Sequence, residues 1–360
     1  MNLENLAVSG LVFFVSVWLT GRLSSPASRL RLLDHPNERS LHGAPVPRTG
    51  GLAILASLAL GVLLAAGWAY LRGAAPALDA RRSLWIVGML LPVAAVSLWN
   101  DWLELPAGLR LAVHGLAAAG VVLGAGLTIE QLRVPSINTW RLGWLAVPLT
   151  ILCLVWMTNL YNFMDGMDGF AGGMAAVGFS FLGYLGWRGG DSFIATLSLL
   201  TVGATSGFLL YNRPPARIFM GDVGSTLLGF LAGALAVLGV HQGLFELWVP
   251  VLIFSPFIVD ASVTLCRRLL KGERVWQAHR QHYYQRMVLL GWSHRKTVLA
   301  EYCLMLASGS SAVIYPKLSE GGRLSLLIAW LLVYAGLGLA VCLAEGRTAR
   351  SGPAAERDVR

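Results

Sequence analysis

Charged side chains are scarce in this chain of 360 residues. Asp, Glu, Lys and Arg together make up only 13% of it, whereas hydrophobic residues make up 56%. A soluble domain carries about 25% charged residues, so this composition excludes an ordinary soluble protein. Apolar runs long enough to cross a bilayer recur along the chain. The sequence therefore predicts an all-α polytopic membrane protein.

Cysteine is also rare, with four residues, and no two of them form a Cys-x-x-Cys pair. This spacing indicates neither a disulfide framework nor a zinc site, and we expect the four thiols to be small core residues. Lys and Arg are absent before and within the first apolar run, 3–21. We therefore expect a retained first span rather than a cleaved signal peptide.

Eleven apolar segments predict membrane-spanning helices. They are 3–21, 50–71, 83–99, 108–126, 143–160, 170–187, 192–210, 224–240, 247–266, 297–315 and 324–343. The sequence shows no internal repeat, so we predict one membrane domain over 1–344 and a flexible tail over 345–360. The intervening segment 127–142 is compatible with a short hairpin.

Lys and Arg are distributed unevenly between the two sets of loops that eleven spans create. Most of the 28 Lys and Arg residues lie in one set and in the C-terminal tail. The positive-inside rule places this set in the cytoplasm and the N-terminus in the periplasm. The polar loops then share the cytoplasmic face, which predicts one composite site in a cleft there. These loops are 22–49, 100–107, 161–169, 211–223 and 267–296.

The most informative stretch has the sequence Asn-Leu-Tyr-Asn-Phe-Met-Asp-Gly-Met-Asp-Gly-Phe-Ala-Gly-Gly. Its polar residues recur at three-residue steps after an apolar run: Asn159, Asn162, Asp165 and Asp168. Such steps keep side chains roughly on one face of a helix. A helix cap and a Gly-rich turn would explain one Asp-Gly pair. Four polar groups at the end of a membrane helix instead indicate a polar ligand, and paired carboxylates favour a cation.

Two further motifs place a carboxylate at the end of an apolar span. Asp101 lies in Trp99-Asn-Asp-Trp102 and is either a catalytic or metal-binding carboxylate or a solvated interfacial one. Asp222 lies in Gly-Asp-Val-Gly-Ser at the start of the eighth span. Free N–H groups at a helix start suit a metal–pyrophosphate, although Asp222 or Ser225 would also serve as an N-cap.

Loop 22–49 combines Arg and His, and its residues Arg39, His42 and Arg48 either bind phosphate or attract anionic lipid headgroups. Asp260, inside the ninth span, either faces the site or pairs with Arg267 or Arg268.

Loop 267–296 contains His279, Arg280 and His282. Two His residues three apart can ligate zinc, but no further Cys or His lies nearby to complete a set. We therefore interpret this loop as phosphate-binding.

Together these loops resemble the polyprenyl-phosphate N-acetylhexosamine-1-phosphate transferase superfamily, glycosyltransferase family 4. Its bacterial branches include MraY, WecA and the WbpL-like enzymes that initiate O-antigen. The resemblance runs from about residue 34 to about residue 296 and rests on five separated motifs in the family's order. It implies transfer of an (N-acetylamino)sugar-1-phosphate from a UDP-sugar to undecaprenyl phosphate, with release of UMP. The implied cofactor is Mg²⁺, with Mn²⁺ as a substitute.

The resemblance also implies roles for individual residues. Asp101, Asp165 and Asp168 would be catalytic, and Asp222 with Asp165 would bind the metal. The implied substrate-binding residues are Asn159, Asn162, Asn212, Phe219, His279, His282, Arg280, Arg39 and His42. Asn212 and Phe219 match positions that hold the uracil ring. The chain departs from the family at Asn100, where the first Asp of a pair is expected, and an amide supplies neither a base nor negative charge.

The His loop is most similar to the WbpL-like branch, so the implied donor is a UDP-N-acetylhexosamine or a UDP-N-acetyl-6-deoxyhexose. The implied setting is the bacterial inner membrane, with the lipid bilayer and undecaprenyl phosphate as partners, no nucleic acid, and a homodimer as one option. The alternative is a membrane transporter of a phosphorylated or nucleotide-linked substrate. It predicts charges near the bilayer midplane and half-repeats, whereas these ionisable residues gather at one face.

Overall fold

The computed structural model describes residues 3–30, 32–36, 43–73, 80–274 and 279–351. Its α-helices are α1 (Leu3–Ser24), α2 (Gly50–Leu71), α3 (Ala80–Leu103), α4 (Ala107–Ala119), α5 (Ala146–Phe163), α6 (Phe170–Arg188), α7 (Ser192–Asn212), α8 (Gly221–His241), α9 (Trp248–Ile253), α10 (Ser255–Leu270), α11 (Tyr283–Leu289), α12 (His294–Ile314) and α13 (Glu320–Ser351). Two short hairpins pair β1 (Leu33–Asp34) with β2 (Val46–Pro47), and β3 (Gln131–Val134) with β4 (Asn138–Arg141).

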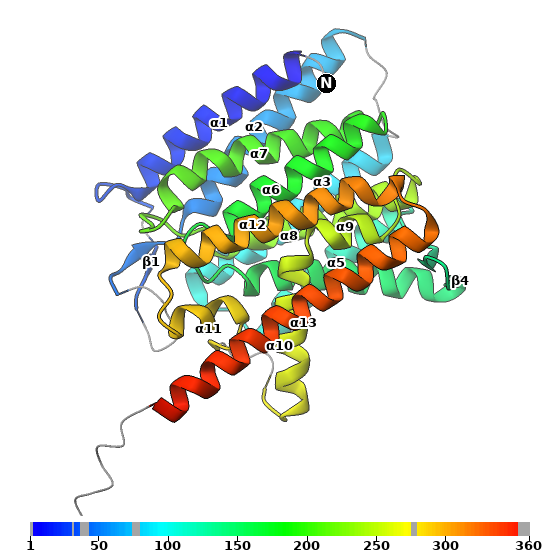
Figure 1. The fold of residues 1–360 in the computed structure, drawn as a ribbon. Helices are drawn as coiled ribbons and strands as arrows, with labels where there is room; N and C mark the ends of the chain where they lie inside the picture. Colours follow the sequence, from blue (N-terminus) through cyan, green and yellow to red (C-terminus); the bar gives the residue numbers. More distant parts are fainter. Residues whose placement is uncertain (1–2, 31, 37–42, 74–79, 275–278, 352–360) are drawn as a thin grey trace, which may run out of the picture.

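Long helices lie alongside one another in a bundle (Figure 1), as expected for a polytopic membrane protein. Ten of the described helical segments are long and apolar enough to cross a membrane. The hairpin β3–β4 confirms the predicted structure of segment 127–142. At the far end of the chain, α13 continues to Ser351, so the described residues of the predicted flexible tail are helical.

Helix α8 is the centre of the bundle. In its most apolar stretch 89% of the residues are buried, compared with 6% in α13. It packs between α3 and α5, and a Cβ atom at Gly229 would lie 2.6 Å from the Met157 carbonyl oxygen. Small residues at such contacts let membrane helices approach closely. This contact holds the middle of α8 close to α5.

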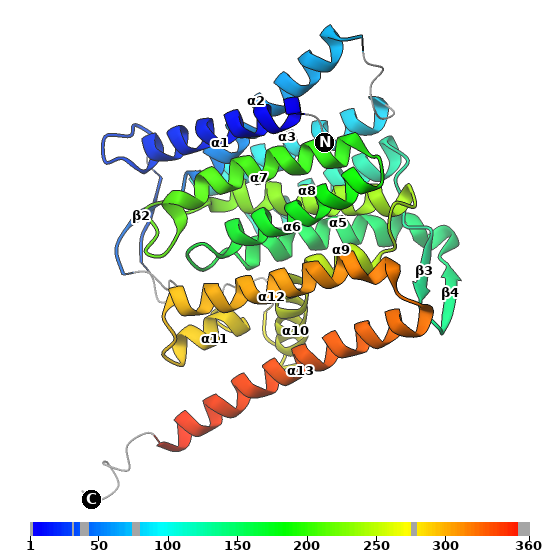
Figure 2. The same ribbon diagram turned by 45° about the horizontal axis from the view of Figure 1, so that its top comes forward.

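The predicted span 247–266 is wrong as a single helix, and ten rather than eleven spanning helices are found among the described residues. The segment is divided into α9 and α10, with Pro256 in the first turn of α10. Proline has no backbone N–H and favours a helix start, so hydropathy alone overestimates this span. Figure 2 shows α10 running across the direction of the neighbouring long helices.

Together α9 and α10 still connect the two ends of the bundle. Leu247, just before α9, borders a cavity beside hairpin β3–β4, whereas Asp260 in α10 contacts His282 at the other end. Figure 1 shows β1 and β4 at these opposite ends. Which end faces the cytoplasm stays a prediction from the distribution of Lys and Arg.

Candidate active site

Asp101 lies at the end of α3 and is 4% exposed. Its carboxylate accepts hydrogen bonds from the backbone N–H groups of Asp222, at 3.2 Å, and Val223, at 3.3 Å. These N–H groups belong to the first turn of α8, where unpaired donors and the helix dipole favour an anion. Asp101 therefore caps α8 from a neighbouring helix and fixes the position of Asp222.

Asp222 is surrounded by donors from three other segments. The Asn162 amide donates to its Oδ1 at 2.8 Å, and the Asn100 amide donates to its Oδ2. A guanidinium nitrogen of Arg110 lies 3.3 Å from the same Oδ2. Asn100 thus supplies a hydrogen-bond donor that an aspartate at this position would lack.

The start of α2 lies against the start of α8, backbone to backbone. Gly50 donates to the Phe219 carbonyl at 2.9 Å and Gly51 to the Met220 carbonyl at 2.7 Å. A Cβ atom at Gly51 would overlap with the backbone of Gly224. This contact also places Arg48 beside the site, where its guanidinium donates to the Asp101 carbonyl oxygen.

Asp165 lies in the loop between α5 and α6 and is half-buried. Burial, and then repulsion from Asp222, Asp101 and Asp34, raise the pKa of Asp165 to about 8. Carboxylates that raise one another's pKa favour either a proton or a cation between them. The sequence motifs therefore converge on an end of the bundle with excess negative charge.

We expect the protein to lose stability as pH rises when divalent cations are absent. Asp165 has a pKa of about 8 in the folded protein against an ordinary value of 3.8. The stabilising contribution of its proton is full below the ordinary value and is lost as pH rises through about 8. Thermal unfolding in detergent with EDTA, from about pH 5 to about pH 9, measures this. Asp165→Asn should flatten the profile, and an unchanged slope would contradict the assignment.

Asp168 lies outside this cluster of carboxylates. Its Oδ2 accepts a hydrogen bond from the Ala216 N–H at 3.0 Å and lies 3.5 Å from His294 Nδ1. The buried Asn212 amide accepts from the Gly169 N–H at 3.0 Å and donates to the Ile218 carbonyl at 2.9 Å. Both side chains fasten the α7–α8 loop to the α5–α6 loop. Their direct roles in catalysis and uracil binding stay predictions.

Asn159 and Phe219, two further residues predicted to bind substrate, lie near these loops and are not hydrogen-bonded to the described carboxylates. Asn159 donates to the Val155 carbonyl of its own helix at 2.7 Å, and Phe219 is half-buried. Arg39 and His42 lie outside the described residues.

The His loop is fastened by Asp260. Its Oδ1 lies 3.1 Å from His282 Nδ1 and accepts from the Tyr283 N–H at 3.0 Å, and its Oδ2 accepts from the Tyr284 N–H at 3.2 Å. Asp260 therefore holds the start of α11. Among the described residues Asp260 contacts His282 and the start of α11, and no ion pair between Asp260 and Arg267 or Arg268 is found there.

His279 lies against His282, with ring centroids 4.9 Å apart. Burial, and then the neighbouring His282 and Arg268, lower the pKa of His279 to about 4. The His279 ring is therefore neutral at pH 7, and half-buried Arg280 lies beside it in the same loop. The loop also reaches the carboxylates, because a Cβ atom at Gly166 would overlap with the Tyr284 hydroxyl.

Arg110 and Asn100 are the site residues that the sequence interpretation missed. Arg110 is the one Asp, Glu, Lys or Arg residue in the predicted span 108–126. A lone cation in an apolar span requires a polar partner. The position of Arg110 in such a span could therefore have identified it as a site residue. For Asn100 the sequence offered only a departure from a motif. Its contact with Asp222 depends on the packing of α3 against α8.

Asp222 and Asp165 are the residues that would hold a magnesium ion, with phosphate oxygens and water completing its coordination. Among the described residues, no group of three or more His, Cys, Asp or Glu side chains is arranged to hold a metal. Mg²⁺ does not require such a cage, because it commonly takes one or two carboxylates together with phosphate oxygens and water. Asp222 and Asp165 supply two carboxylates of this kind, and their mutual repulsion favours a cation.

Comparison with known proteins identifies the family of this chain. The sequence model of glycosyl transferase family 4 matches residues 83–240. The chain is 31% identical over 339 residues to the probable undecaprenyl-phosphate N-acetylglucosaminyl 1-phosphate transferase of Bacillus subtilis (strain 168), covering 92% of this chain and 91% of the relative.

Two other relatives show the same relationship. Identity is 30% over 347 residues to the decaprenyl-phosphate N-acetylglucosaminephosphotransferase of Mycolicibacterium smegmatis, with 87% and 83% covered. It is 31% over 281 residues to the phospho-N-acetylmuramoyl-pentapeptide-transferase of Levilactobacillus brevis, with 74% and 83% covered. The chain therefore belongs to glycosyl transferase family 4 and is a multi-pass membrane enzyme of the phosphosugar transferase class.

Proposed function

We propose that the protein transfers an N-acetylamino sugar-1-phosphate from a UDP-sugar to undecaprenyl phosphate, giving a polyprenyl-diphosphate sugar and UMP. The observation that carries this proposal is the meeting of Asp101, Asp165 and Asp222 from three segments at one end of a bundle of apolar helices. A water-soluble and a lipid substrate can meet only at such a boundary. The names of the relatives supply the substrate class.

Among donors, UDP-N-acetylglucosamine is favoured, because two relatives are named for N-acetylglucosamine phosphate transfer. The WbpL-like branch, with UDP-N-acetyl-6-deoxyhexose donors and O-antigen as the product, is the second option and rests on the His loop. In either case the reaction would initiate a cell-surface glycan at the inner membrane.

The chemistry joins two anions. An oxygen of the lipid phosphate attacks the β-phosphorus of the UDP-sugar, a new P–O bond forms, and the bond to the α-phosphate breaks to release UMP. Repulsion between the phosphates is the main obstacle, so cationic groups should supply most of the stabilisation. Arg110 and Arg48 are the cations placed beside the carboxylates. Bound Mg²⁺ on Asp222 and Asp165 would neutralise charge on the diphosphate.

Proton removal is a minor requirement in this reaction. A phosphate monoester has its second pKa near 6, so the lipid phosphate is largely ionised at neutral pH. Asp101 is buried and already accepts two backbone hydrogen bonds. We therefore assign Asp101 to positioning the start of α8 rather than to base catalysis.

Replacing Asn100 with Asp should make the protein dependent on a divalent cation for stability. The change removes the amide that donates to Asp222 and puts a second carboxylate beside it. Unfolding in detergent with EDTA should become easier by about 1–3 kcal/mol, and saturating Mg²⁺ should recover most of the loss. Asn100→Ala, which removes the donor without adding charge, is the control. Equal Mg²⁺ responses of the two variants would contradict a cation site here.

The test of the function is UMP release by purified protein in detergent. The assay supplies undecaprenyl phosphate, Mg²⁺ and a panel of UDP-N-acetylhexosamines, with and without EDTA. Lipid-dependent and metal-dependent UMP from one donor would support the proposal and name the sugar. A transporter would instead move intact UDP-sugar into proteoliposomes without releasing UMP, and that outcome would overturn the proposal.

A further inference from the structure

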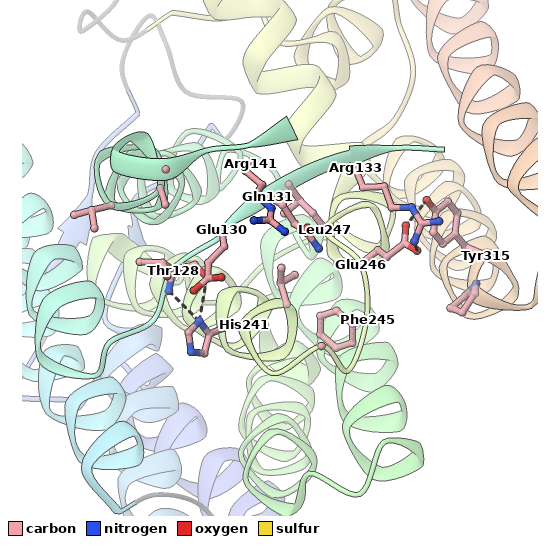
Figure 3. Close-up of a pocket in the computed structure, with 16 residues that line it drawn as sticks. Thr128, Glu130, Gln131, Arg133, Arg141, His241, Phe245, Glu246, Leu247 and Tyr315 are labelled. Carbon is pink, nitrogen blue, oxygen red and sulfur yellow. Dashed lines mark hydrogen bonds and ion pairs between the residues drawn. The ribbon is translucent and has the colours of Figure 1, made fainter. Parts of the chain in front are cut away.

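A cavity of 990 Å³ lies at the end of the bundle opposite the carboxylates (Figure 3). Its walls come from hairpin β3–β4, the end of α8, the loop to α9 and the turn after α12. The polar side chains that line it include Glu130, Gln131, Arg141, His241, Glu246 and Tyr315. None of these residues belongs to the candidate active site, so the cavity requires a separate explanation.

Some of the charges around the cavity neutralise one another. Arg133 lies 3.4 Å from Glu246 and 2.7 Å from Glu320, and Arg323 lies 2.7 Å from Glu246. The His241 ring is joined by its Nδ1 to the backbone of Thr128. These groups hold the hairpin against the bundle, and their charges are balanced within the protein.

Glu130 and Arg141 are not part of this network of ion pairs. Both line the cavity, and within the described part of the chain neither forms a side-chain ion pair with another residue. Glu130 directly precedes β3, its backbone carbonyl accepts from the Leu142 N–H at 2.9 Å, and Arg141 at the end of β4 is paired with Gln131. The cavity thus presents one free anion and one free cation to whatever occupies it.

The cavity lies where a membrane surface is expected. It is beside the ends of spanning segments Gly143–Phe163, Gly221–His241 and His294–Lys317. Trp140 and Trp144 on the neighbouring segment are exposed, and exposed Trp is enriched at the headgroup level of a bilayer. The lining also includes apolar Val147, Val240 and Phe245, which suit the glycerol part of a lipid.

We propose that this cavity binds the headgroup of a zwitterionic phospholipid, with the phosphate at Arg141 and the ammonium at Glu130. A purely anionic ligand would pair with Arg141 alone, and a purely cationic one would pair with Glu130 alone. A phosphoethanolamine group carries both charges on neighbouring atoms. The site is separate from the transferase chemistry, so the proposal stands or fails independently of it.

The test is a binding titration of purified, detergent-solubilised protein with short-chain phosphatidylethanolamine, phosphatidylglycerol and soluble glycerophosphoethanolamine. Phosphatidylethanolamine should bind about tenfold more tightly than phosphatidylglycerol, because the second charge adds one charge-assisted hydrogen bond. Glycerophosphoethanolamine should bind more weakly than the lipid, since it lacks the acyl contacts. Equal affinity for the two lipids, or glycerophosphoethanolamine that binds at least as tightly as the lipid, would overturn the proposal.

Single substitutions test the contributions of Arg141 and Glu130 to lipid binding separately. Arg141→Gln and Glu130→Gln should each weaken phosphatidylethanolamine binding about tenfold, and Glu130→Gln should also remove the preference over phosphatidylglycerol. Arg188→Gln, an exposed cation at the end of α6 outside the cavity, is the matched control and should bind as the wild type does. Thermal unfolding checks that each variant is folded. Wild-type affinity in both cavity variants would overturn the proposal.

Discussion

Replacing Asp222 with Ala should lower the rate of UMP release by about 10³-fold or more. This carboxylate receives donors from Asn100, Asn162 and Arg110, so its removal leaves those groups without their common acceptor. The loss should appear in kcat and in the Mg²⁺ dependence, because the ion and the diphosphate would both be held less well. Steady-state kinetics with a Mg²⁺ titration measures both quantities.

Comparing the Asp222→Ala and Asp101→Asn variants distinguishes a carboxylate that acts in the reaction from one that positions the start of α8. Asp101→Asn keeps an acceptor oxygen for one of the two N–H groups, those of Asp222 and Val223, that donate to separate oxygens of Asp101. Because this variant still holds one of these groups and leaves Asp222 itself in place, its rate should fall less than that of Asp222→Ala. Glu4→Gln serves as the control, because Glu4 forms an exposed ion pair with Arg72, and such pairs contribute about 0–1 kcal/mol. Near-normal turnover of Asp222→Ala would show that the site is built around a different carboxylate.

Replacing Asp260 with Ala should destabilise the protein by about 3 kcal/mol and release the His loop. The change leaves His282 and the N–H groups of Tyr283 and Tyr284 without their acceptor, and these groups are largely buried. Unfolding in detergent measures the stability. Hydrogen exchange over residues 279–290 should show faster exchange at the start of α11.

Asp260→Asn is the informative partner variant, because its amide oxygen still accepts hydrogen bonds but carries no charge. It should lie between the wild type and Asp260→Ala in stability. Glu4→Gln, which changes an acid of α1 paired with Arg72, should leave the exchange of α11 unchanged. If Asp260→Ala exchanges at the wild-type rate, the loop must be held chiefly by the packing of Tyr284.

The helices followed from the sequence because a spanning segment must satisfy its backbone within itself. Long apolar runs predicted eleven spans, and ten of these match the spanning helices found among the described residues. Gly-rich polar motifs marked where several of them end. The prediction failed at 247–266. Hydropathy reports how apolar the side chains are, and it does not show that a new helix begins at Pro256. The direction of α10 is a property of tertiary packing and could not be obtained from the run of residues.

The candidate site was predictable as a set of loops but not as a set of contacts. Asp165 and Asp168 occupy equivalent places in two Asp-Gly pairs, yet their surroundings differ. Repulsion from Asp222 and Asp101 acts on Asp165. Asp168 instead bonds to Ala216. The difference arises because the chain turns between them, so the three-residue spacing no longer keeps both on one face. Asn100 was likewise only a departure from a motif in the sequence, and its hydrogen bond to Asp222 depends on the packing of α3 against α8.

The contact between Gly51 and Gly224 has a consequence for how this enzyme tolerates sequence change. A larger residue at either position would force the starts of α2 and α8 apart, and Asp222 would move with α8 away from Asp101. The spacing of the carboxylates is therefore determined by main chain meeting main chain. Substitutions among the apolar side chains on the outside of the bundle do not alter this main-chain contact. The sequence of the outer surface can therefore vary while the spacing of the carboxylates stays the same.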